Sequence, residues 1–198
     1  MLRTRFLRAF AALTAAILIA SCASDSSAPD PTGLSGPDAA LTDHSVDAGG
    51  REFHALWWKH NLSSVVRVSK TIDKSGGVLT IAETGLTMEF PAGAVSGPIT
   101  ITVTADQKYV AYKMDPAGTQ FLKDVTVTQA LSTTELSGQT LQNQIYATYI
   151  ADDSISLSGS VPVLEIEPSK TLFYPNSAIP QAQVWIIRHF SRYMLASG

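Results

Sequence analysis

The chain has 198 residues and a formal net charge of −3, with 45% hydrophobic and 16% charged residues. This composition allows a buried core beneath a lightly charged surface. No basic run occurs, so the sequence offers no electrostatic basis for binding nucleic acid. The single cysteine, Cys22, can form neither an internal disulfide nor a zinc-ribbon pair.

The N-terminal residues have the plan of a secretory signal. Arg3, Arg5 and Arg8 come first, without any acidic residue, and an almost wholly apolar run follows at residues 9–20. That run is shorter than the roughly 20 residues that a helix needs to span the hydrocarbon core of a membrane. We therefore expect residues 1–21 to be a signal peptide rather than a permanent transmembrane helix.

The end of this segment, Ile19-Ala20-Ser21-Cys22, resembles the bacterial lipobox. The resemblance implies that Cys22 receives diacylglycerol and that the peptide before it is removed. The alternative is an ordinary secretory signal whose small residues happen to precede a cysteine. Ala23, not an aspartate, directly follows Cys22, which implies sorting to the outer membrane if the organism is diderm. The expected location is the cell envelope, with the chain held by lipid.

The charge of the mature chain also favours a lipid anchor. Loss of residues 1–21 removes three arginines and leaves eleven basic and seventeen acidic residues, a net charge of −6. A chain of that charge gains nothing from anionic lipid headgroups. Acyl chains on Cys22 are therefore the expected contact with the membrane, since two or more of them hold a protein stably.

Residues 22–50 are predicted to be a disordered acidic tether that begins at the lipidated cysteine. The segment is rich in Ser, Asp, Pro, Gly and Ala, contains five aspartates and has no lysine or arginine. Its few large apolar residues show no period, so it cannot bury enough apolar surface to offset the entropy of ordering.

Residues 51–62 form an aromatic connecting segment. Leu56, Trp57 and Trp58 lie between His54 and His60. The simpler interpretation is a short helix or strand that packs on the edge of the domain. The alternative is an aromatic patch that touches the membrane interface or a partner.

From residue 63 onward the hydrophobic period is two, which is typical of half-buried strands. Residues 86–90, 99–104 and 125–128 alternate apolar side chains with Thr or Glu, and Gly- or Pro-containing turns separate them. No stretch keeps a helical period over three turns. Residues 63–198 are therefore predicted to form a single antiparallel β-sandwich, so the fold class is all-β, with the sandwich behind a disordered tether.

Three runs in this region look like the ZU-five domain of ankyrins, netrin receptors and the death-domain protein PIDD. They are Gly76-Gly77-Val78-Leu79, residues 85–101 with Pro91-Ala92-Gly93-Ala94, and Pro116-Ala117-Gly118-Thr119-Gln120-Phe121. The resemblance covers roughly residues 71–131 and returns at residues 189–193. It implies a β-sandwich with a protein-interaction or structural role and implies no ligand or cofactor. An envelope protein is then the candidate partner.

The sequence contains none of the common nucleotide-binding, zinc-protease or serine-hydrolase motifs. Asp152 and Asp153 are interpreted as a solvated turn rather than a calcium site, and His54 and His60 have no further metal ligand near them. Residues 165 and 167, both glutamates, share one strand face and are interpreted as solvated rather than as a glycosidase pair. We therefore predict no metal, no cofactor and no enzyme activity on outside substrates.

The tripeptide His189-Phe190-Ser191 is the one candidate for chemistry. In PIDD and in a nucleoporin the same tripeptide cleaves itself between Phe and Ser. The alternative function is therefore autocatalytic cleavage, with Ser191 as nucleophile and His189 as base, because residues two apart on a strand share a face. Cleavage would free only residues 191–198, so we predict that the motif is structural and that the peptide bond survives.

Overall fold

The computed structural model describes residues 46–49, 51–150 and 153–198. The predicted signal peptide, Cys22 and residues 23–45 of the predicted tether lie outside the described residues. Val46 and Asp47, at the end of the segment predicted to be disordered, form the short strand β1 (Val46–Asp47).

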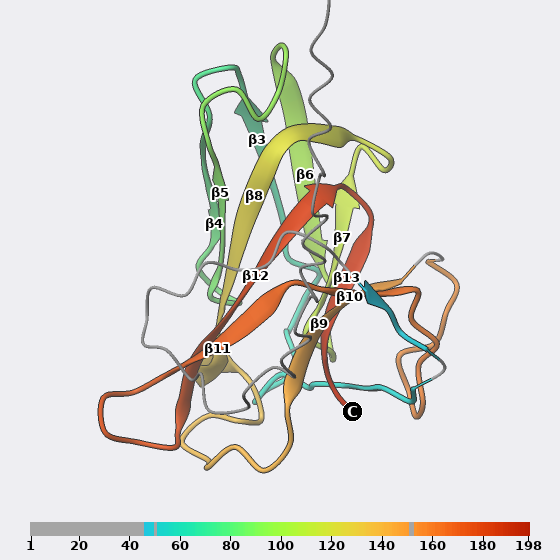
Figure 1. The fold of residues 1–198 in the computed structure, drawn as a ribbon, viewed down its shortest axis with the longest axis vertical. Coiled ribbons are helices and arrows are strands. Elements are labelled where there is room, and N and C mark those ends of the chain that lie inside the picture. Colours follow the sequence, from blue (N-terminus) through green and yellow to red (C-terminus); the bar gives the residue numbers. More distant parts are fainter. Residues whose placement is uncertain (1–45, 50, 151–152) are drawn as a thin grey trace, which may run out of the picture. The chain divides into compact units, whose positions relative to one another are not determined.

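The described chain consists of two antiparallel β-sheets with one short 3-10 helix, η1 (Leu131–Thr133). The all-β prediction is confirmed (Figure 1). The larger sheet has the strand order β1, β10 (Glu165–Glu167), β9 (Ile145–Ile150), β13 (Arg192–Ser197), β7 (Ala111–Asp115), β6 (Ile99–Ala105) and β3 (Arg67–Ile72), with β2 (His54–Ala55) also paired to β13. The smaller sheet has the order β11 (Ser169–Phe173), β12 (Pro180–His189), β8 (Gln120–Ala130), β5 (Leu86–Phe90) and β4 (Gly77–Ile81).

The alternation read from the sequence places the core between the two sheets. On β6, Ile101 and Val103 are fully buried while Thr100 is exposed and Thr102 is half-buried. Strands β5 and β8 repeat this pattern. Pro98 immediately precedes β6, where its missing N–H removes no ladder hydrogen bond.

The backbone of Gly76, just before β4, lies very close to the backbone of residues 90–92, which leaves no room for a side chain. Gly76 has φ of +81°, and a Cβ atom there would lie 2.2 Å from the carbonyl oxygen of Phe90. Any L-residue at position 76 would have to move β5 away from this turn.

Strand β13 lies in the interior of the larger sheet and is buried on both faces. It pairs with β9 along its whole length, with β7 at its start and with β2 at its end. Tyr193 and Leu195 belong to the main core between the sheets, whereas Met194 and Ala196 belong to a second hydrophobic cluster with Phe53. Residues 51–62 therefore contribute to the sandwich itself.

Candidate functional site

The motif His189-Phe190-Ser191 lies where the chain leaves one sheet and enters the other. Strand β12, in the smaller sheet, ends at His189 after an irregularity between Ile187 and His189, and β13, in the larger sheet, begins at Arg192. Figure 1 shows these two red strands joined by a short turn. The motif is therefore not a continuous strand.

Phe190 occupies the core beneath this turn. Its side chain is 1% exposed, and its ring makes edge contacts with Phe121 at 4.8 Å and with Phe90 at 6.4 Å between centroids. Its backbone is held as firmly. Its N–H donates to the carbonyl of Thr119 at 2.8 Å, and its carbonyl accepts from the N–H of Gly118 at 2.9 Å.

His189 and Ser191 are not brought together as nucleophile and base. The alternation of strand side chains does not apply here, because the strand is interrupted at residues 190 and 191. His189 Nδ1 lies 3.2 Å from the hydroxyl of Tyr193, and that hydroxyl donates to the carbonyl of His189 at 2.8 Å. No hydrogen bond joins His189 to Ser191 in the described part of the chain.

The imidazole of His189 instead faces two glutamates of β10. Among the residues that the structure describes, Glu165, Glu167 and His189 are the one group of three metal-ligating side chains whose ligand atoms gather, all within 4.8 Å of one another. Rings of Tyr149 and Tyr193 pack at 5.0 and 6.0 Å from the imidazole centroid. We call these five side chains the His189 cluster.

The interpretation of Glu165 and Glu167 as a solvated face is wrong for Glu167. The two residues do share a face, but Glu167 is only 7% exposed, and its Oε1 atom has no hydrogen-bond partner. Burial, and secondarily the charge of Glu165, raises the pKa of Glu167 to about 7. Burial, followed by the charge of Glu167, likewise raises the pKa of Tyr193.

The other residues considered for metal binding lie apart from this cluster. Asp153 pairs with Lys113, whereas Asp152 lies outside the described residues. His54 Nδ1 lies 3.1 Å from the carbonyl oxygen of Gly159, and His60 is exposed. Within the described residues, Asp153, His54 and His60 therefore belong to no group of three metal-ligating side chains.

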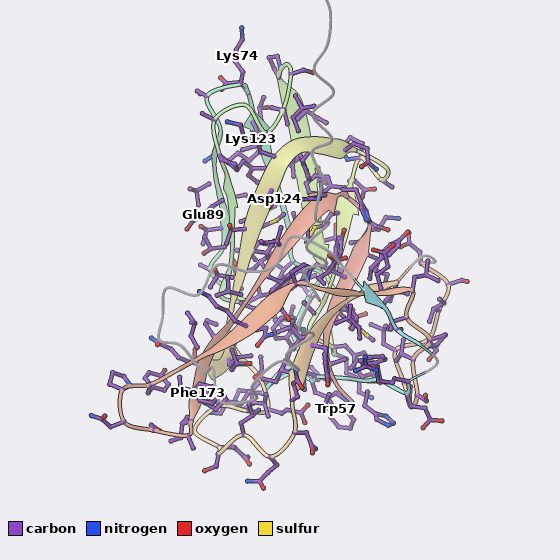
Figure 2. The ribbon with its side chains drawn as sticks, viewed as in Figure 1. Trp57, Lys74, Glu89, Lys123, Asp124 and Phe173 are labelled. Atoms are coloured by element: carbon purple, nitrogen blue, oxygen red, sulfur yellow. The ribbon has the colours of Figure 1, made fainter. Side chains whose placement is uncertain are left out.

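The aromatic segment is divided between core and surface. Leu56 and Trp58 are buried, as the packing interpretation predicts, but Trp57 is 50% exposed. The Nζ atom of Lys108 lies 4.9 Å from the centroid of the Trp57 ring. Trp57 and Phe173 are exposed aromatic side chains in the lower part of the view in Figure 2.

Sequence reasoning missed the His189 cluster because its members are distant in the chain. Two features of the sequence belong to this cluster, the spacing of Glu165 and Glu167 and the tripeptide His-Phe-Ser. Each was interpreted without the other. Register brings them together: Glu165 lies opposite Tyr149, and Tyr149 lies opposite Tyr193, two residues after the motif.

Comparison with known protein families and with curated proteins finds no match to this chain. No helix among the described residues is long and apolar enough to cross a membrane.

Proposed function

We propose that this chain is a lipid-anchored protein of the cell envelope whose β-sandwich serves as a binding or structural module. The observation that carries the proposal is the order of its parts. A charged and then apolar leader ends at the lipobox-like Ile19-Ala20-Ser21-Cys22, an acidic segment follows, and the β-sandwich comes last. Such a chain would hold a folded module at a distance from the membrane to which Cys22 is attached.

The proposed relation to the ZU-five domain is supported by where the resembling motifs lie. Gly76-Gly77 forms the close turn into β4, and Pro91 directly follows β5. Pro116-Ala117-Gly118 precedes β8. Motifs made of Gly, Pro and core residues specify turns and packing, so this relation favours an interaction or structural role without naming a ligand.

Exposed aromatic side chains support binding to another envelope protein. Trp57 is half-exposed beside Lys108. Phe173, the last residue of β11, is 44% exposed, and Tyr174 after it is 43% exposed. Aromatic residues are enriched at protein interfaces, because they bury a large area with few rotatable bonds.

The contacts of its parts support a structural role for His189-Phe190-Ser191. Phe190 fills the core, and Tyr193 engages both the ring and the carbonyl of His189. A serine nucleophile needs a base within hydrogen-bond reach. Since His189 makes its contacts with Tyr193 and the glutamates, we propose that the Phe190–Ser191 bond persists in the mature protein.

Self-processing is the second candidate, and one contact favours it. The Gly118 N–H already donates to the Phe190 carbonyl, where it would stabilise the oxyanion formed when Ser191 Oγ attacks that carbon. The amine of Ser191 would leave to give an ester, and water would then hydrolyse the ester to a Phe190 carboxylate. Because β13 is paired on both sides, the released fragment would stay in the sheet.

Intact-mass measurement of the membrane-extracted protein under denaturing conditions tests both candidates at once. We expect one chain that begins at Cys22, carries diacylglycerol and extends past Ser191. A chain without acyl mass would refute the anchor. A chain that ends at Phe190, restored to full length by Ser191→Ala, would replace the structural role with self-processing.

A further inference from the structure

The His189 cluster joins the two sheets of the sandwich. Glu165 and Glu167 lie on β10 of the larger sheet, and His189 ends β12 of the smaller one. All three are on regular strands or at a strand end, where backbone pairing sets their positions. Their ligand atoms lie within 4.8 Å of one another although the glutamates and the histidine are more than twenty residues apart in the chain.

Glu167 supplies the second observation. Its side chain is more than nine-tenths buried, and Oε1 accepts no hydrogen bond. A buried carboxylate oxygen without a partner is costly, and native proteins satisfy such atoms by pairing them or by coordinating a metal ion with them. Two metal-ligating side chains lie close to Glu167. One is the carboxylate of Glu165, which repels the charge of Glu167, and the other is the imidazole of His189.

Tyr193 prepares the imidazole as a ligand. The phenol has one proton, which it donates to the carbonyl of His189. The contact between the same oxygen and Nδ1 therefore requires Nδ1 to carry the donated proton. In the neutral tautomer with that proton on Nδ1, the free lone pair is on Nε2. Metal-binding histidines commonly have this arrangement, in which the other ring nitrogen donates to a neighbouring acceptor.

We propose that Glu165, Glu167 and His189 bind one divalent transition-metal ion, for which Zn²⁺ is the probe. Two carboxylate oxygens and one imidazole nitrogen are ordinary zinc ligands, and three protein ligands with one position for water complete a tetrahedron. Ligand atoms on such an ion lie about 3.3 Å apart, so modest side-chain rotations bring these three into place. Calcium and magnesium need six or more oxygens and do not suit an imidazole.

The bound ion would connect β10 to the end of β12 and thereby hold the turn that carries His189-Phe190-Ser191. This role is independent of the lipid anchor and of the module's partner. Because the ion binds the folded chain, it also raises the thermal midpoint of unfolding, and this rise grows with the logarithm of the ion concentration divided by its dissociation constant.

The test uses the full chain with Cys22→Ser, so that no thiol competes for zinc, after treatment with chelator. Isothermal titration with Zn²⁺ is expected to show one ion per chain, and Co²⁺ is expected to give the visible absorption of a tetrahedral site. Glu167→Gln and His189→Ala should each weaken Zn²⁺ binding at least tenfold. Glu89→Gln and His60→Ala, at exposed positions, are the matched controls and should bind as the parent does.

Circular dichroism checks that each variant is folded. The Co²⁺ spectrum is measured with the His189 cluster intact, so it tests the site without any substitution in the cluster. Three results would overturn the proposal: no Zn²⁺ binding, equal binding after either substitution in the cluster, or binding of Ca²⁺ in preference to Zn²⁺. Loss of lipid from the natural chain would refute the anchor and leave this result unchanged.

Discussion

Phe190→Ala removes the side chain that fills the core beneath the turn between β12 and β13. Burial of a phenylalanine to the degree seen here, with 1% of its surface exposed, predicts a loss of about 3–5 kcal/mol on truncation to alanine. The edge contacts with Phe121 and Phe90 each add about 0.5–1.5 kcal/mol beyond area burial. We therefore expect a loss in the upper part of the range, about 4–5 kcal/mol.

Urea unfolding followed by tryptophan fluorescence measures this loss, because Trp185 is buried and reports on the core. The midpoint should fall while the slope with urea stays constant, since a smaller side chain leaves the surface exposed on unfolding nearly unchanged. Phe173→Ala, at a side chain that is 44% exposed, is the control and should cost about 0.5 kcal/mol or less. A loss below about 1 kcal/mol for Phe190→Ala would show that Phe190 does not pack as described.

Three further predictions concern the anchor, the tether and the buried carboxylate. Cys22→Ser should leave a chain that keeps residues 1–21 or carries no lipid, and a natural chain without acyl mass at its N-terminus would contradict lipid attachment at Cys22. Limited proteolysis should cut first within residues 23–45, whereas early cuts within residues 78–128 would count against an ordered sandwich. With chelator present, the contribution of Glu167 to the free energy of unfolding should be full below pH 4.5 and fall by on the order of 3 kcal/mol as pH rises through 7, because the pKa of Glu167 is raised from 4.5 to about 7 in the folded chain. Glu167→Gln should remove this slope, and a slope that persists in the variant would assign it to another group.

Local pattern was sufficient to predict the strands whose two faces differ. Residues 99–104 match all but the last residue of β6, and residues 86–90 match β5, because alternation of apolar and polar side chains indicates a half-buried strand directly. Strand β13 escaped the same reasoning, because it is buried on both faces and shows no alternation. Strand β11 was not predicted either, because its first four residues are all half-buried and its two faces do not differ.

The candidate site could be predicted only in parts. The sequence shows that Glu165 and Glu167 share a face and that His189-Phe190-Ser191 is unusual, and both observations are local. That Glu167 is buried depends on β12 lying beside β10, which is a contact between two sheets. That His189 turns toward the glutamates rather than toward Ser191 depends on the strand ending at residue 189.

The sequence by itself determined the properties that depend on neighbours along the chain. Among these are the two-residue period of the sandwich strands, the turns that glycine and proline impose, and the acidic, aperiodic composition of residues 22–50. The physical causes of these properties act over a few residues. The tertiary structure alone decided what depends on pairing across distance. It placed β13 in the interior of its sheet, buried the Oε1 atom of Glu167 without a hydrogen-bond partner, and brought His189 close to both glutamates. The physical reason is that the burial of a charged group and the positions of metal ligands depend on segments that are distant in the chain. A short stretch of sequence therefore does not predict them.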